Sequence, residues 1–333
     1  MIRIGINGFG RIGRYLTRLV SQRPDEFEIV AVNARASNQD LAHLLKYDSI
    51  HGHFPGTVSP TDKGIRVNDR EIPVTRLDKG EWLWAEYGAD IVVDTSGSLK
   101  KREGLAMHMD RGAKKVIMSA PVKDGDITIV WGVNHEKYDP EKHHVISAAS
   151  CTTNCLAPVV KVLHSEFGIN HGLITTIHSY TMSQRLLDGS QKDIRRARAA
   201  ALSLIPTSTG AAQAVALVIP ELKGRMDGIA VRIPTANVSM VDLTCEMERE
   251  VTAVAINSAM HRAADTYMKE ALGYSDEPLV SVDYNGDTHG GVVDSLSTAV
   301  MDRSMVKMLI WYDNEAGFTN QLLRLVRHVG QQL

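Results

Sequence analysis

The residues Ile2–Gly13 read IRIGINGFGRIG, an apolar strand pattern that runs directly into a glycine turn. Gly8, Gly10 and Gly13 have the spacing G-x-G-x-x-G, and Arg11 to Val20 carries apolar residues at helical spacing. In such a turn the first glycine makes the bend, the second lets a pyrophosphate approach the backbone, and the third lets the helix pack closely. The helix start adds N–H groups and partial positive charge. The stretch therefore predicts dinucleotide binding, with a purely structural turn as the alternative.

The following residues extend this pattern to a parallel sheet. Glu28–Asn33 reads EIVAVN, a second buried strand, so the chain opens as strand, turn, helix, strand. Thr57–Arg76 is instead punctuated by turn residues and predicts a small β-meander. Further strands are expected at Asp90–Thr95, Lys115–Ser119, Asp126–Val130 and His144–Ala148.

The end of the second strand bears on the choice of cofactor. A ribose-binding acid is expected about 20 residues after the glycines, yet the chain reads Asn33-Ala34-Arg35. Without that carboxylate, Arg35 could pair with a 2′-phosphate through a charge-assisted contact. This pattern favours NADP as the cofactor. The alternative is a solvated Arg35 beside a site that merely tolerates NAD.

Composition excludes several classes of protein. The 333 residues carry 37 Lys+Arg against 39 Asp+Glu, which argues against nucleic-acid binding as the main role. No run reaches the ~20 apolar residues of a membrane helix, and the N-terminus lacks a signal-peptide pattern. Three cysteines are too few for a disulfide framework and lack the CxxC spacing of zinc sites, so no metal is expected. We expect a cytoplasmic protein that acts on small molecules.

The pattern changes after Cys151. Longer strands are expected at Leu173–Ser179, Gly228–Ile233, Val238–Met247 and Lys307–Tyr312, with helices at Thr252–Leu272 and Thr319–Val329. Alternation in these strands suits an antiparallel sheet. The loop Thr181–Ile205 has little periodicity, and loops of that length are usually functional or held by another subunit. We expect two domains, 1–149 with 315–333 and 150–314.

Cys151 is the strongest candidate for a nucleophile. It follows a buried strand and precedes the helical run of Leu156, Val159, Val160 and Leu163. Unpaired N–H groups at a helix start favour thiolate over thiol. In a chain with a dinucleotide fold, this suggests attack on an aldehyde; the alternative is a small buried cysteine at a helix start. Cys155 and Cys245 are expected in the core.

Longer motifs now add a family resemblance. The chain contains INGFGRIGR, KYDSIHG, SAASCTTNCLAP, TTIHSYT, RRARAA, PTSTGAA, VRIPTANVS and WYDNEAGF, from Ile6 to Phe318. These resemble phosphorylating glyceraldehyde-3-phosphate dehydrogenase in order and from end to end. The resemblance implies an α/β fold, a Rossmann dinucleotide-binding domain plus an α+β catalytic domain, assembled as a homotetramer.

The resemblance also implies residue roles. Cys151 would be the nucleophile and His178 the general base, acting on D-glyceraldehyde 3-phosphate and inorganic phosphate through a thiohemiacetal and a thioester. Thr181 and Arg232 would hold the substrate phosphate, and the attacking phosphate would meet Ser150, Thr152, Arg196, Thr209 and Gly210. Positions that match the family's cofactor contacts are Arg11, Ile12, Ser96, Gly97, Ser119 and Asn314. Arg195 and Arg198 are expected to be solvated or intersubunit charges.

Three departures from the family concern NAD or NADP. The usual Asp after Asn33 is Ala34, and the basic residue expected near the adenine is displaced, because Arg76 is followed by Leu77. Where NAD-specific members carry Leu-Pro, the chain has Gly189-Ser190, and a serine there resembles NADP-using relatives. We expect dual use of NAD and NADP or a preference for NADP.

Two other functions compete. Erythrose-4-phosphate dehydrogenase is similar around the cysteine, but its relatives depart from HSYT and from PT-x-TGAA, which this chain keeps. A non-catalytic role in RNA binding or redox sensing is the second alternative, since Cys151 would be oxidisable.

Overall fold

Two compact units make up the chain, and the computed structural model describes all residues, 1–333. Unit 1 comprises Met1–Ile129, His135–Ala149 and Leu322–Leu333, and unit 2 comprises Val130–Asn134 and Ser150–Gln321. The domain division expected from sequence, at 149/150 and 314/315, stays a prediction.

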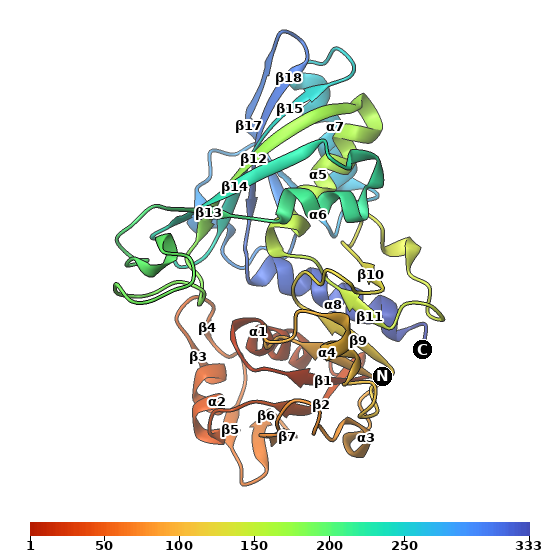
Figure 1. Ribbon diagram of the computed structural model, residues 1–333, viewed down its shortest axis with the longest axis vertical. Helices are drawn as coiled ribbons and strands as arrows, with labels where there is room; N and C mark the ends of the chain where they lie inside the picture. The colour runs from red at the N-terminus through yellow and green to blue at the C-terminus, as the bar shows by residue number, and fades with distance from the viewer. The chain divides into compact units, whose positions relative to one another are not determined.

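Unit 1 is built on a nine-stranded sheet in the order β10-β11-β9-β8-β1-β2-β7-β6-β5 (Figure 1). Its strands are β1 (Ile2–Asn7), β2 (Phe27–Asn33), β5 (Val58–Pro60), β6 (Gly64–Val67), β7 (Arg70–Thr75), β8 (Ile91–Asp94), β9 (Lys115–Met118), β10 (Ile127–Thr128) and β11 (Val145–Ser147). The pairs from β10 to β7 are parallel, and β5, β6 and β7 pair antiparallel. The parallel sheet and the meander predicted from sequence are both confirmed. A separate hairpin pairs β3 (Tyr47–Asp48) with β4 (Gly52–His53).

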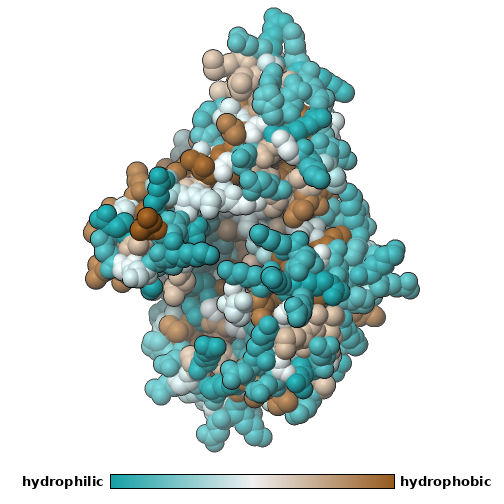
Figure 2. All heavy atoms as spheres, viewed as in Figure 1, coloured by the Kyte–Doolittle hydropathy of each residue, from teal (hydrophilic) through white to brown (hydrophobic).

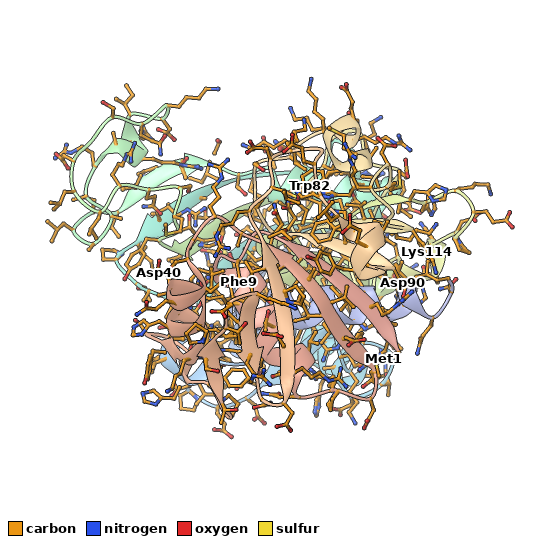
Figure 3. The ribbon with its side chains drawn as sticks, turned by 90° about the horizontal axis from the view of Figure 1, so that it is seen from below. Met1, Phe9, Asp40, Trp82, Asp90 and Lys114 are labelled. Atoms are coloured by element: carbon orange, nitrogen blue, oxygen red, sulfur yellow. The ribbon has the colours of Figure 1, made fainter.

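The helices of unit 1 cover this sheet. They are α1 (Arg11–Ser21), α2 (Asn38–Lys46), α3 (Trp84–Tyr87) and α4 (Arg102–Ala106). Residues of α1 contact β2, and α4 contacts β9 and β11. Gly5 of β1 leaves the space that the Trp84 ring fills, since a Cβ there would lie 2.8 Å from that ring. At the side of the sheet, Asp90 and Lys114 form an ion pair of 2.8 Å (Figure 3).

Unit 2 contains a seven-stranded sheet in the order β13-β14-β12-β15-β18-β17-β16. Its strands are β12 (Ile169–Ser179), β13 (Ile205–Ser208), β14 (Met226–Ile233), β15 (Ser239–Met247), β16 (Leu272–Ser275), β17 (Gly291–Met301) and β18 (Met305–Tyr312). The sheet is mixed rather than antiparallel throughout, because β12 pairs parallel with β14 and β16 parallel with β17. In the chain, α6 lies in the crossover between β12 and β14, whereas the connection between β16 and β17 contains only the short 3-10 helix Ser281–Tyr284.

Three helices of unit 2 contact its sheet: α5 (Cys151–Phe167), α6 (Ala211–Val218) and α7 (Ala253–Asp265). The predicted helix Thr252–Leu272 is too long, because α7 ends at Asp265 and Leu272 begins β16. Thr266 leaves helical geometry with φ −120° and ψ −104°. Met268 and Ala271 are nevertheless buried, which is why the apolar pattern continues past the end of the helix.

The loop from Thr181 to Ile205 contains only one short 3-10 helix, Arg195–Ala197. It folds on itself through backbone bonds from Arg185 to Arg196 and from Gly189 to Ala197. Figure 2 shows hydrophobic side chains on this loop, at the left of the view. Its most exposed apolar residues are Met182, Leu186, Leu187, Ile194, Leu202 and Leu204.

The terminal helix α8 (Ala316–Gly330) begins in unit 2 and continues into unit 1 from Leu322 onward. Gly330 lies against Ile2 of β1, and Arg327 forms an ion pair with Glu26. None of the helices is both long enough and apolar enough to cross a membrane.

Candidate active site

The glycine turn of unit 1 has the geometry that a dinucleotide requires. The strand order reverses between β1 and β8, and in such sheets the ligand lies outside the carboxyl ends of the strands at that point. Gly8 has φ +94°, and a Cβ on Gly13 would lie 2.5 Å from the Gly8 carbonyl oxygen. A Cβ on Gly10 would meet nothing within 4 Å, so this face of the turn is open. These residues fit a bound pyrophosphate.

The other predicted cofactor residues of unit 1 gather at the same edge. Asn33 ends β2, Ser96 and Gly97 follow β8, and Ser119 follows β9. Ser96 is held by two hydrogen bonds to Asp94 Oδ1, from its amide at 2.9 Å and its hydroxyl at 2.8 Å. Because the carboxyl ends of parallel strands meet at one edge, these side chains and Ile12 of α1 share one region of unit 1.

Arg11, the first residue of α1, is fixed by a carboxylate. Its guanidinium donates two hydrogen bonds to Asp48, at 2.6 and 3.0 Å. Burial opposes ionisation of Asp48, but the bonds from Arg11 and from the amides of His51 and Ile50 hold the pKa of Asp48 well below its usual range. Sequence reasoning did not identify Asp48 as the partner of Arg11, although it lies within the KYDSIHG motif.

The basic residues near the end of β2 differ in their contacts. Arg35 is exposed, and Ala34 before it is buried, with its amide bonded to the Thr75 carbonyl. Arg76 is committed to the protein, since it donates to the Ala36 carbonyl and to Asn38 Oδ1. The Arg76 guanidinium is thus engaged within the protein, whereas the Arg35 side chain is exposed to solvent.

In unit 2, Cys151 is the first residue of α5. Ala149 has φ +58°, a conformation rare for residues other than glycine, and it turns the chain sharply between β11 and α5. Ser150 caps the helix, with its hydroxyl oxygen accepting the Thr153 amide at 3.1 Å. The predicted position of Cys151 at the junction of a strand and a helix is confirmed. Cys155 and Cys245 are buried, as expected.

The sheet register brings two further candidates to Cys151. His178 on β12 pairs directly with Arg232 on the parallel strand β14. Cys151 Sγ lies 3.4 Å from His178 Nε2, and Arg232 Nη1 lies 2.7 Å from His178 Nδ1. Arg232 Nη1 also donates to the Ser179 carbonyl at 2.9 Å, whereas its buried Nε has no partner. Cys151, His178 and Arg232 thus form one cluster, in which the buried N–H donor at Arg232 Nε has no partner.

Two groups at the same distance from His178 Nδ1 require opposite tautomers. The Ser179 carbonyl, 2.7 Å away, can only accept a proton, whereas the Arg232 guanidinium, also 2.7 Å away, can only donate one. In the tautomer that carries its proton on Nδ1 and donates to Ser179, Nε2 presents a lone pair to the Cys151 thiol. Burial, together with the charge of Arg232, lowers the pKa of His178 to about 3. A neutral imidazole therefore faces the sulfur.

The thiol itself is not activated in the way that sequence reasoning suggested. Burial raises the pKa of the Cys151 thiol, against the opposing charge of Arg232 and the hydrogen bonds at Thr152. The pKa of Cys151 is thus shifted in the direction opposite to the one expected from its position at a helix start. A proton acceptor beside the sulfur therefore becomes necessary, and Nε2 is the nearest.

Tyr312 supports this cluster and was missed from the sequence. Its hydroxyl lies 2.9 Å from Thr152 Oγ1 and 2.8 Å from Thr176 Oγ1, and its ring meets His178 edge to face at 5.8 Å. Burial raises the pKa of Tyr312, so the phenol stays neutral. The only sequence signals are its place in WYDNEAGF and the position of Thr176 two residues before His178 on the same strand face.

Asn314 follows β18 and is linked to the same cluster. Its Oδ1 accepts the Ser239 hydroxyl at 2.8 Å, and Ser239 Oγ accepts the Ser179 amide at 3.1 Å. Asp313 fixes the chain here, because its carboxylate accepts the amides of Glu315 and Ala316 at the start of α8. Asn314 is thereby oriented in unit 2.

The remaining phosphate candidates lie on neighbouring segments. Thr181 follows β12, and Thr209 and Gly210 stand at the start of α6, where Thr209 Oγ1 accepts the Ala211 amide. Arg196 donates to Thr207 at 2.9 Å and lies 3.5 Å from Asp193. No contact joins these four residues to Cys151. Ser190, on the exposed loop, offers its carbonyl to Arg185.

Comparisons with known proteins agree with this arrangement. Residues 2–102 match the family model described as glyceraldehyde 3-phosphate dehydrogenase, NAD binding domain, and residues 150–314 match glyceraldehyde 3-phosphate dehydrogenase, C-terminal domain. The chain is 55% identical over 332 residues to glyceraldehyde-3-phosphate dehydrogenase of Geobacillus stearothermophilus, covering 99% of each chain. It is 53% identical over 330 residues to glyceraldehyde-3-phosphate dehydrogenase 1 of Bacillus cereus, covering 99% of this chain and 98% of the relative. The resemblance seen in the motifs is thereby confirmed.

Proposed function

The chain belongs to the glyceraldehyde-3-phosphate dehydrogenase family, and we propose that it oxidises D-glyceraldehyde 3-phosphate to 1,3-bisphosphoglycerate with reduction of NAD or NADP. It is an NAD(P)-dependent oxidoreductase. The observation that carries the proposal is the 3.4 Å approach of Cys151 Sγ to a neutral His178 Nε2 beside Arg232. The comparisons favour this substrate over erythrose 4-phosphate.

Cys151 attacks the aldehyde carbon, and its thiol proton passes to His178 Nε2. A carbon–sulfur bond forms while the carbonyl oxygen becomes the thiohemiacetal oxyanion, which the backbone N–H of Cys151 helps to hold. When NAD or NADP is bound, its nicotinamide would supply the hydride acceptor for this carbon, and loss of the hydride leaves a thioester. Inorganic phosphate then attacks the thioester carbonyl, the carbon–sulfur bond breaks, and the Cys151 thiolate regains its proton from His178 Nε2. Because the oxidised acyl group is held as a thioester and transferred to phosphate rather than to water, part of the free energy of oxidation is retained in the acyl phosphate.

Arg232 serves the substrate phosphate. Its buried Nε lacks a partner in the protein, and such a donor is costly unless a ligand satisfies it. Thr181 is its proposed companion, whereas Ser150, Thr152, Arg196, Thr209 and Gly210 serve inorganic phosphate. Arg196 would have to loosen its contacts with Asp193 and Thr207 to do so.

Asn314 is proposed to orient the nicotinamide carboxamide. In unit 1 the open face at Gly10 receives the pyrophosphate, and Arg35 meets the 2′-phosphate of NADP. Ser190 is proposed to face that phosphate from a neighbouring subunit. We propose dual use of NAD and NADP or a preference for NADP.

The enzyme is proposed to be a homotetramer. The exposed apolar side chains between Met182 and Leu204 support this, because patches of that kind mark protein interfaces. A Leu187→Asp variant should therefore dissociate in mass photometry, and an unchanged mass would count against this role of the loop. Three unpaired cysteines suit a reducing compartment, and we propose the cytoplasm.

The activity is tested by following NAD(P)H formation in the purified protein. We expect formation to require both glyceraldehyde 3-phosphate and inorganic phosphate, and to disappear in Cys151→Ala. Cys245→Ala, which alters a cysteine outside the cluster, is the matched control. A higher kcat/KM for erythrose 4-phosphate, or full activity without phosphate, would contradict the proposal.

A further inference from the structure

A network of buried hydrogen bonds runs from α3 to the carboxyl ends of the strands in unit 1. Trp84 Nε1 donates to His108 Nδ1 at 2.9 Å, and His108 Nε2 lies 3.1 Å from Asp94 Oδ2. Asn7 Nδ2 donates to the same oxygen at 2.8 Å. His108 and Asp94 are both fully buried. We refer to Trp84, His108, Asp94 and Asn7 as the His108 network.

The donors and acceptors fix the charge of each member. An indole N–H can only donate, so His108 Nδ1 must offer a lone pair. The proton of the neutral ring is then on Nε2, which donates to Asp94. The other oxygen of Asp94 receives the amide and the hydroxyl of Ser96. With donors on both oxygens, Asp94 is an ionised carboxylate paired with a neutral histidine.

The network ends at the glycine turn. Asn7 is the last residue of β1, Asp94 is the last of β8, and the order of strands reverses between them. Ser96, which Asp94 holds, approaches the turn so closely that a Cβ on Gly8 would lie 2.7 Å from its backbone. On the other side, Asn7 Oδ1 accepts Asn33 Nδ2 at 3.0 Å. Asp94 therefore fixes the positions of Asn7 and Ser96, which border the glycine turn that would bind a pyrophosphate.

His108 supplies the only bond to Asp94 that comes from outside this edge. Its ring is clamped by Trp82, which stacks on it at 3.8 Å between ring centres (Trp82 is labelled in Figure 3). Without His108, Oδ2 of a buried carboxylate would keep only the Asn7 donor. A buried carboxylate with too few donors is unfavourable, so the Asp94 side chain would turn, and Ser96 and Asn7 would lose their fixed acceptor.

From this geometry we infer that His108 is a positioning residue for the dinucleotide: by donating to Asp94 it holds Asn7 and Ser96 where the glycine turn can bind pyrophosphate. The inference rests on the proposed function, because it deepens the cofactor site. His108 touches no reacting atom and acts only through Asp94.

The test compares cofactor binding with stability. His108→Leu removes both hydrogen bonds, whereas the amide of His108→Gln can accept from Trp84 and donate to Asp94. Ile65→Ala, which truncates a fully buried side chain on β6 of the same unit, is the control for general loss of stability. Dissociation constants for NAD and for AMP are measured by calorimetry well below the melting temperature of each variant.

We expect His108→Leu to raise the Kd for NAD by at least about tenfold, the scale for one hydrogen bond to a buried charge. His108→Gln should recover the Kd to within about threefold of wild type. AMP, which lacks the pyrophosphate, should bind all variants within about threefold. Ile65→Ala should lower the melting temperature without changing either Kd.

An unchanged Kd for NAD in His108→Leu, or a rise matched by Ile65→Ala, would overturn the inference and leave the dehydrogenase function intact. If the wild-type protein bound no NAD, both the positioning role of His108 and the proposed dehydrogenase function would be overturned. If His108→Leu does not fold, His108→Asn replaces it, because its shorter amide keeps the Trp84 acceptor but does not reach Asp94. Wild-type affinity in His108→Asn would then refute the inference.

Discussion

Exchanging the residues at the end of β2 should switch the enzyme between NADP and NAD. Arg35 is exposed, while the nearby Arg76 is held by Ala36 and Asn38. A charge-assisted hydrogen bond is worth about 1.5 to 3 kcal/mol, and ordering an exposed arginine offsets part of it. If the net contribution of Arg35 is about 1 to 1.4 kcal/mol, Arg35→Ala should lower kcat/KM for NADP about five- to tenfold and leave kcat/KM for NAD within about twofold of wild type.

The opposite change is Ala34→Asp, which restores the carboxylate that favours a free ribose. A unit negative charge ~5 Å from a phosphate of charge about −2, at an effective dielectric constant of ~60, costs about 2 kcal/mol. The kcat/KM for NADP should therefore fall roughly 30-fold, while that for NAD rises through a hydrogen bond to the ribose.

The assay measures kcat/KM for both cofactors at saturating glyceraldehyde 3-phosphate and phosphate, in wild type and in each variant. Arg66→Ala, which removes an exposed arginine on β6 of the same unit, controls for the change in net charge. Equal losses for NAD and NADP in Arg35→Ala would refute the reasoning. So would a wild type that prefers NAD by orders of magnitude and is unchanged by the mutation.

Three further predictions concern the cluster at Cys151 and the Arg11 pair. His178→Gln should slow the first-turnover burst of NAD(P)H by about 10²- to 10⁴-fold in rapid mixing, because the thiol loses its proton acceptor; an unchanged burst would exclude His178 as the base. Tyr312→Phe should lower the free energy of unfolding by about 1 to 3 kcal/mol, because Thr152 and Thr176 lose a buried hydrogen-bond partner. In thermal unfolding, the double variant Tyr312→Phe/Thr176→Val should lose less stability than the sum of the losses in the two single variants. Because the folded pKa of Asp48 is depressed, its ion pair with Arg11 stabilises the protein above the ordinary pKa of about 3.9 and less as pH falls below it. The melting temperature of Asp48→Asn should therefore lie below that of wild type at pH 7 and approach it toward pH 3; a constant difference would contradict this account.

Short-range patterns predicted much of unit 1. The strand, glycine turn and helix at Ile2–Val20 were readable because strand alternation, helical spacing and turn chemistry act over a few residues. The position of Cys151 at the start of α5 was readable for the same reason. The end of α7 was not, because the buried Met268 and Ala271 continue the apolar spacing beyond the last helical residue.

Such short-range patterns cannot predict contacts between residues that are far apart in the sequence. His178 meets Arg232 only because β12 and β14 pair parallel in one register, and Tyr312 reaches Thr152 from 160 positions away. The direction of the Cys151 pKa shift depends on the balance between burial and nearby charge, which the helix start alone does not decide. Family motifs named several of these residues without giving the contacts that link them.

The chain enters unit 1 three times, and its last visit is the segment Leu322–Leu333. Leu322, Val326 and Val329 are buried there, so the first unit lacks part of its core until the final residues have been synthesised. A ribosome-bound chain therefore cannot complete its nucleotide-binding half first, despite having made most of it first. The amino-terminal part of unit 1 can therefore complete its core only after residues 322–333 have left the ribosome. Truncation of these residues should destabilise the nucleotide-binding unit, although most of that unit is encoded at the start of the chain.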